Sequence, residues 1–278
     1  MASLIGILGY PLAHSISPVF QQAALDHLGL DARYLAWETE PSKLGERVDS
    51  LRVDGVLGAN VTIPHKEAVL QLLDEIDPTA QAIGSVNTIV NEGGRLKGHN
   101  TDAPGFLRGL REHGAFDPKG KKALVMGAGG SGRGVVFALA QAGIETVTLV
   151  NRTLSRAEGL AREVKARFPD IAIEAHQQAP HPLEYDLLVN CTSIGMKHTP
   201  MEGDTPVELK GIRAGALVCD LVYNPQETTL LKLAKEAGAR ALGGLPMLIF
   251  QGAIAFDLWF ERKAPVEVMF EAARKALR

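Results

Sequence analysis

A lysine and an aspartate in the first half of the chain have the side chains that acid–base chemistry needs. Lys66 ends the segment 60–66 (NVTIPHK), and Asp102 ends the segment 100–102 (NTD). Pro64 predicts a helix start, so we expect Lys66 in the first turn of a helix, where the positive helix end would favour a neutral, proton-accepting amine. A carboxylate beside this lysine could help it carry the proton of an alcohol under oxidation. A solvated lysine and a helix-capping aspartate are the alternatives.

Three more polar residues lie where the first strands are expected to end, which is where α/β sheets collect their ligands. Ser15 and Ser17 are two residues apart and could both donate to one carboxylate, although Ser17-Pro18 is also an ordinary helix start. Asn87 is polar in an otherwise apolar strand. These residues predict a binding site for a small polar molecule.

A glycine-rich segment follows the apolar run 123–126 directly and opens a helical run. It matches the dinucleotide-binding pattern, in which glycines permit the tight turn, the approach of backbone amides to the pyrophosphate and close helix packing. A purely structural strand-to-helix turn is the alternative. The candidate cofactor residues are Gly127, Ala128, Gly129, Gly130, Ser131 and Gly132.

The next expected strand, 146–150, leads into Asn151, Arg152 and Thr153, where enzymes that use NAD place an acid. A carboxylate would repel a 2′-phosphate, whereas a guanidinium binds phosphate in a bidentate geometry. Arg152 therefore predicts NADP as the cofactor. Arg156, one helical turn later, could add a second charge or be an ordinary solvated residue.

These residues need a scaffold of alternating strands and helices, which indicates an α/β protein with mostly parallel sheets. In the first series we expect strands at 3–9, 33–38 and 54–61, helices at 18–29, 41–52 and 65–73, and a hairpin of 86–90 with 95–98. In the second series we expect strands at 123–126, 146–150, 171–174, 186–191 and 216–222, and helices at 131–142, 154–167 and 227–237. Residues after Gly244 read as helical, and 195–215 as a loop.

Composition narrows the function classes. A length of 278 residues predicts two domains. The net charge is −3 and there is no run of like charges, so the sequence does not indicate binding to nucleic acid or to an anionic membrane. No apolar run approaches the roughly 20 residues that span a bilayer. Cys191 and Cys219 are too few for a disulfide framework, and the eight histidines show no metal-ligand spacing. We expect a cytoplasmic protein with a small-molecule partner and no metal; the sequence leaves its oligomeric state open.

Together these segments resemble the shikimate dehydrogenase family from Ile5 to Trp259. The matching motifs, in chain order, are 9–12 (GYPL) with 14–18 (HSISP), 60–66, 84–88 (GSVNT), 100–102, 127–130, 151–153 and 190–196 (NCTSIGM), supported by 220–225 (DLVYNP) with Thr228 and 244–248 (GLPML) with Gln251.

The resemblance implies NADP-dependent, reversible reduction of 3-dehydroshikimate to shikimate, in aromatic amino-acid and chorismate biosynthesis. It implies a substrate-binding domain of residues 1–103 and 245–278, to which the C-terminal helices return, and a Rossmann-type NADP-binding domain of residues 104–244. Lys66 becomes the acid/base residue, with Asp102 as its partner. The implied ligands of the substrate carboxylate are Ser15, Ser17 and Tyr223; those of its hydroxyls are Thr62, Asn87, Asp102 and Gln251. Thr192, Ser193 and Gly244 join the implied cofactor residues.

Two other functions fit the same scaffold. A quinate/shikimate dehydrogenase paralogue would be expected to differ at Asn151-Arg152-Thr153, and often to carry a threonine in the serine loop. A non-catalytic, NADP-sensing protein would be free to lose Lys66 and Asp102, which are both present.

Overall fold

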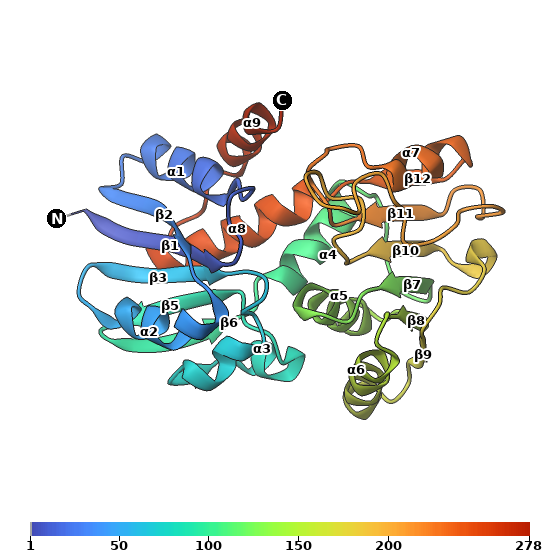
Figure 1. Cartoon of the computed structure of the whole chain (residues 1–278), viewed down its shortest axis with the longest axis horizontal. Coiled ribbons are helices and arrows are strands. Elements are labelled where there is room, and N and C mark those ends of the chain that lie inside the picture. The colour runs from blue at the N-terminus through green and yellow to red at the C-terminus, as the bar shows by residue number, and fades with distance from the viewer. Residues whose placement is uncertain (1) are drawn as a thin grey trace. The chain divides into compact units, whose positions relative to one another are not determined.

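The computed structural model describes residues 2–278, and the chain divides into two compact units. The first unit comprises the residues up to Gly105 together with Ile249–Arg278, and the second comprises Phe106–Leu248. The chain leaves the first unit within helix α4 (Asp102–Glu112) and returns to it within helix α8 (Leu245–Phe260) (Figure 1). The C-terminal helices therefore return to the first unit, as predicted.

The first unit is built on a six-stranded sheet in the order β2-β1-β3-β5-β6-β4. Its strands are β1 (Ser3–Gly9), β2 (Ala32–Glu38), β3 (Val56–Val61), β4 (Glu75–Ile76), β5 (Thr88–Glu92) and β6 (Arg95–His99). Only β5 runs against its neighbours, because it and β6 form the predicted hairpin. Gly93 and Gly94 have φ of 63° and 92°, as a tight two-residue hairpin turn requires.

Helices cover both faces of this sheet. On one face α2 (Leu44–Asp49) and α3 (Pro78–Ile83) enclose a core of aliphatic side chains with β1, β3 and β6. Toward the other face lie α1 (Ser17–His27), α8 and α9 (Val266–Ala276), with α1 and α9 side by side (Figure 1). On α8, the indole of Trp259 donates to the Ile89 carbonyl at 2.9 Å and ties this helix to β5.

The second unit is a parallel six-stranded sheet in the order β12-β11-β10-β7-β8-β9. Its strands are β7 (Lys122–Met126), β8 (Thr146–Val150), β9 (Ala172–His176), β10 (Leu187–Asn190), β11 (Leu217–Asp220) and β12 (Arg240–Leu242). Its other helices are α5 (Gly130–Gln141), α6 (Leu154–Arg167) and α7 (Thr229–Glu236). This is the Rossmann strand order, whose reversal point lies between β7 and β10. The predicted two-domain α/β class with a Rossmann unit is confirmed.

Several short elements depart from the sequence expectations. The stretch 65–73 forms only a 3-10 helix, Ala68–Leu72, preceded by turns, so an α-helix there was wrong. The stretch 41–52 is broken into 3-10 helices, Pro41–Lys43 and Ser50–Arg52, around α2. The strands β4 and β12 and the helix α3 were not predicted. Within residues 2–278, no helix has the length and apolar content needed to cross a bilayer.

Candidate active site and cofactor-binding turn

Lys66 and Asp102 form an ion pair in the first unit. The distance from Lys66 Nζ to Asp102 Oδ2 is 2.6 Å, and the exposed fractions of the two side chains are 11% and 5%. Protein encloses most of both side chains, so this contact is shielded from solvent. The two side chains therefore meet. The expectation that Lys66 lies in the first turn of a helix was wrong: Lys66 lies in a turn, so no α-helix end acts on its amine.

The backbone around Lys66 is anchored on both sides. His65 is buried, and its Nε2 lies 2.6 Å from the Thr39 carbonyl oxygen, which can only accept and so places the ring proton on Nε2. The carbonyl of Lys66 accepts from the Val86 amide at 2.9 Å, directly before Asn87. The amine is thus presented by a turn that two other loops hold in place.

Asp102 is the first residue of α4, but it does not cap that helix. Asn100 does so, because its Oδ1 accepts from the Ala103 amide at 3.0 Å while its Nδ2 donates to the Ser85 carbonyl at 2.8 Å. The capping role considered for Asp102 is therefore taken by Asn100. The Asp102 carboxylate is left to Lys66 and Asn87.

Asn87 is the hub of the site. Its Oδ1 accepts from the Thr101 amide at 2.6 Å; a backbone N–H can only donate, so the orientation of the side-chain amide is fixed. Its Nδ2 then lies 2.9 Å from Thr101 Oγ1, 3.0 Å from Asp102 Oδ1 and 3.2 Å from Gln251 Oε1. Three acceptors share two hydrogens. Asn87 therefore connects Gln251, on α8, with the Lys66–Asp102 pair.

A second group of buried polar residues forms hydrogen bonds that hold Asn87 and Thr101 in place. Asn60 donates through Nδ2 to the Asn87 carbonyl at 3.2 Å and to Thr88 Oγ1 at 3.1 Å, and its Oδ1 accepts from the Tyr34 hydroxyl at 2.7 Å. Thr88 Oγ1 lies 3.1 Å from Thr101 Oγ1. Burial holds the pKa of Tyr34 well above its ordinary value, which keeps this donor protonated. The sequence interpretation gave these residues no role, although Asn60 is a polar residue in the otherwise apolar strand β3.

Ser15 and Thr62 lie in loops that follow strand ends of the same unit. Ser15 and Thr62 are partly buried, and Ser17 is buried as the first residue of α1. The N-cap position belongs to Ile16, which has no side-chain hydrogen bond to offer, so Ser17 does not act as the cap. Thr62 follows β3, and its amide donates to the Leu8 carbonyl at the end of β1. Tyr223, by contrast, follows β11 in the second unit.

The glycine-rich turn of the second unit has the form that a pyrophosphate site needs. Gly127 has φ of 108°, which a side chain would rarely adopt. A Cβ added to Gly132 would overlap the Gly127 carbonyl, so helix and turn approach each other too closely for a larger residue. A Cβ added to Gly129, the N-cap of α5, would meet no atom within 4 Å. The open space over Gly129, at the positive end of α5, fits a bound phosphate group.

Asn151 joins this turn to the end of β8. Its Oδ1 accepts from the Ala128 amide at 3.1 Å, its Nδ2 donates to the Thr153 carbonyl at 2.8 Å, and its backbone amide donates to the His176 carbonyl at 3.1 Å. Arg152 and Arg156 are exposed around the start of α6. Two guanidinium groups beside the turn fit an additional phosphate on the ribose.

Across the reversal point of the sheet, Thr192 and Ser193 follow β10. Asn190 Oδ1 accepts from both the amide and the hydroxyl of Thr192, at 3.0 and 2.6 Å, and Asn190 Nδ2 donates to Asp220 Oδ1 at 2.9 Å. Burial raises the pKa of Asp220, and its hydrogen bonds with Thr228, Val222 and Asn190 oppose that rise. Asn190 and Asp220, which stood in the recognised motifs without a role, thus shape the Thr192 turn. A Cβ on Gly244 would overlap the Leu221 backbone.

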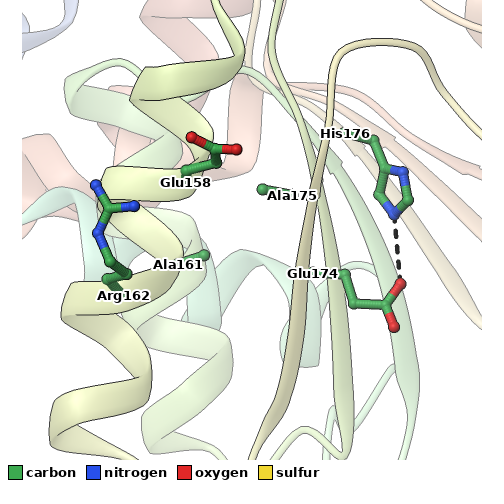
Figure 2. Close-up of a pocket in the computed structure, with 6 residues that line it drawn as sticks. All are labelled: Glu158, Ala161, Arg162, Glu174, Ala175 and His176. Atoms are coloured by element: carbon green, nitrogen blue, oxygen red, sulfur yellow. Dashed lines mark hydrogen bonds and ion pairs between the residues drawn. The ribbon is translucent and has the colours of Figure 1, made fainter.

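A separate hollow of about 480 Å³ lies between α6 and β9 in the second unit. Figure 2 shows Glu158, Ala161 and Arg162 on the helix, with Ala175 beside them. The His176 Nε2 atom is 3.3 Å from Glu174 Oε2. None of these lining residues belongs to the predicted site. Among residues 2–278, no group of three or more His, Cys, Asp or Glu side chains could hold a metal ion, and both cysteines are free thiols.

Comparison with known proteins covers nearly the whole chain. The family model of the shikimate dehydrogenase substrate binding domain matches residues 7–89, that of shikimate / quinate 5-dehydrogenase matches 111–200, and that of the shikimate 5′-dehydrogenase C-terminal domain matches 244–274. The shikimate dehydrogenase (NADP(+)) of Methanopyrus kandleri is 44% identical over 99% of this chain and 96% of its own.

Two of the similar solved structures are a shikimate dehydrogenase and a quinate dehydrogenase. Shikimate 5-dehydrogenase from Thermus thermophilus, in complex with NADP(H) and shikimate, has a TM-score of 0.88 and 42% identity over 99% of this chain and 100% of that chain. Quinate dehydrogenase from Corynebacterium glutamicum, in complex with NAD, has the same TM-score of 0.88 but 31% identity, over 99% of each chain. From these full-length matches, the chain belongs to the shikimate dehydrogenase family.

Proposed function

We propose that this protein catalyses the reversible, NADP-dependent reduction of 3-dehydroshikimate to shikimate. The observation that carries the proposal is the shielded Lys66–Asp102 pair, 2.6 Å apart and joined to Asn87, in a family whose members include NADP-dependent shikimate dehydrogenases. The first unit binds the substrate, and the second binds NADP.

Lys66 is the acid/base residue of the proposed reaction. In the direction of reduction its ammonium group donates a proton to the carbonyl oxygen of the substrate, and in the direction of oxidation the amine takes the hydroxyl proton back. NADPH, when bound, supplies the hydride. Asp102 holds the Lys66 amine in place through the 2.6 Å contact.

The substrate is a hydroxylated acid, which many neutral donors and acceptors recognise best because each unmade bond is costly. We assign the carboxylate to the hydroxyls of Ser15, Ser17 and Tyr223. The ring hydroxyls fall to Thr62, Asn87, Asp102 and Gln251. The two hydrogens of Asn87 Nδ2 already serve three acceptors, and this supports the assignment. A substrate hydroxyl oxygen could accept one of these hydrogens without leaving the amide unpaired.

We assign the cofactor to the second unit. The backbone around Gly129 and the N-terminus of α5 hold the pyrophosphate, and Arg152 with Arg156 holds the 2′-phosphate. The remaining assigned cofactor residues are Gly127, Ala128, Gly130, Ser131, Gly132, Asn151, Thr153, Thr192, Ser193 and Gly244. A cytoplasmic location, where thiols stay reduced, is consistent with the two free cysteines and remains part of the proposal.

Initial rates of NADPH formation from shikimate test the proposal. Purified protein is assayed with shikimate and NADP, and in matched reactions with quinate or with NAD. We expect rapid turnover only with shikimate and NADP. Comparable rates with quinate or NAD would instead support the quinate/shikimate paralogue, and absence of turnover despite tight NADP binding would support the sensing protein.

A further inference from the structure

Thr101 forms hydrogen bonds with both the oxygen and the nitrogen of the Asn87 side-chain amide. Its backbone amide donates to Asn87 Oδ1 at 2.6 Å, and its hydroxyl accepts from Asn87 Nδ2 at 2.9 Å. These are the shortest hydrogen bonds at each end of that amide. Together they define both the position and the plane of the group that donates to Asp102.

Thr101 is itself held rigidly. Its carbonyl accepts from the Gly105 amide at 3.0 Å in the first turn of α4, and its hydroxyl lies 3.1 Å from Thr88 Oγ1. Its exposed fraction is only 1%, so its side chain is enclosed by protein. Asn60 Nδ2 in turn donates to Thr88 Oγ1 at 3.1 Å. Thr101 is thus part of the same network of buried hydrogen bonds as Asn60 and Thr88.

We propose that Thr101 is a positioning residue that acts through Asn87 to hold the Asp102 carboxylate against Lys66. With its first Nδ2 hydrogen on Thr101 Oγ1, Asn87 directs the second toward Asp102 Oδ1 at 3.0 Å, ahead of Gln251 at 3.2 Å. Without the Thr101 hydroxyl, the Asn87 amide keeps only its anchor at Oδ1, so its Nδ2 end is no longer held in position and its two hydrogens are redistributed between Asp102 and Gln251. The inference rests on the proposed function, because it concerns the same ion pair.

Two substitutions separate the hydroxyl from the shape of the side chain. Thr101→Val keeps the shape and removes the hydroxyl, whereas Thr101→Ser keeps the hydroxyl. A misplacement of the catalytic group by a fraction of an ångström costs roughly 10- to 100-fold in rate, so we expect a loss of that size in kcat for Thr101→Val, with a smaller change in KM for shikimate. Thr101→Ser is expected to restore kcat to within about threefold of wild type, since the hydrogen bond is retained.

Thr148→Val is the matched control. Thr148 is also a buried threonine whose hydroxyl takes part in a side-chain hydrogen bond, at 3.0 Å with Tyr185, but it lies in the core of the second unit. Urea unfolding is measured for every variant. If Thr148→Val lowers kcat as much as Thr101→Val at equal stability, the effect belongs to any buried threonine and the proposal is wrong. Thr101→Ala, which cannot crowd the core, carries the same test if the valine variant does not fold.

A double-mutant cycle tests the route through Asn87. Because Thr101 acts by holding Asn87, adding Thr101→Val to Asn87→Ala should lower kcat little further. Losses that multiply would overturn the proposal, as would a normal kcat in Thr101→Val. A wild-type protein without turnover of shikimate would refute the proposed function itself, and the two failures are therefore distinguishable.

Discussion

Replacing Gly132 by alanine is expected to weaken NADP binding by disturbing the geometry of the glycine-rich turn. The added Cβ would lie 2.9 Å from the carbonyl carbon of Gly127 and nearer still to its oxygen, whereas ordinary contact begins at 3.4 Å. The obstacle is backbone, so no side-chain rotation relieves it. The start of α5 must move away from the turn by more than the roughly 0.5 Å that the carbonyl carbon alone requires, because the oxygen lies nearer.

The size of the effect follows from that displacement. A misplacement of 1 Å in a positioned site costs on the order of 100-fold in rate, and we expect an effect of similar size on binding, a rise of roughly 10- to 100-fold in the Kd for NADPH. The overpacked contact should also lower the free energy of unfolding by about 1–3 kcal/mol. The Kd is measured by fluorescence titration with NADPH, and the free energy of unfolding by urea denaturation.

Two glycines of the same unit provide controls for the same substitution. Gly159, within α6, would place its Cβ in open space, so Gly159→Ala should leave the Kd unchanged and stabilise the protein by about 0.5–1 kcal/mol. Gly129 has ordinary extended angles, φ −88° and ψ −174°, and equally open surroundings. Gly129→Ala should therefore fold normally yet bind NADPH at least about 10-fold more weakly, because its Cβ occupies the space assigned to the pyrophosphate.

For each of the three glycine variants, one result would contradict the prediction. Wild-type affinity in Gly132→Ala would refute the argument from close packing. Wild-type affinity in Gly129→Ala would show that the pyrophosphate does not use the space over Gly129. A rise in Kd for Gly159→Ala would mean that any added methyl group in this unit disturbs binding.

Three further changes test other parts of the protein. Lys66→Ala should lower turnover roughly 100- to 10,000-fold, the usual scale for loss of acid/base catalysis, while NADPH titration stays unchanged; near-normal turnover would contradict its role. Arg152→Ala should weaken NADP far more than NAD, because only NADP carries the 2′-phosphate, and titrations in which the two affinities fall equally would contradict that contact. Burial lowers the pKa of His99, so the unfolded chain binds its proton more readily and the free energy of unfolding should fall as the pH drops through 6.5. Urea denaturation between about pH 5.5 and 7.5 should show a smaller fall for His99→Gln, and an unchanged fall would argue against this histidine as a source.

The sequence predicted elements well where period and length agree. The strand Ser3–Gly9 and the helix Leu154–Arg167 have the expected bounds, because the continuous apolar run of the strand and the helical spacing of apolar residues in the helix are each unambiguous. The stretch 65–73 misled because Pro64 is a good helix start, while the backbone of Lys66 bonds instead to Val86 in another loop. The two-residue strand Glu75–Ile76 exists only because β6 is beside it.

The sequence by itself determined the chemistry available: a lysine, an aspartate, paired hydroxyls and a glycine-rich turn followed by an arginine rather than an acid. These follow from residue type and local spacing, which the chain carries along its length. Only the tertiary structure decided that Lys66 and Asp102 meet, that Asn100 takes over the helix cap, and that Thr101 and Asn60 fasten Asn87. Hydrogen bonds between residues far apart in the chain depend on atoms within about 3 Å of each other, and the folded packing alone sets such distances.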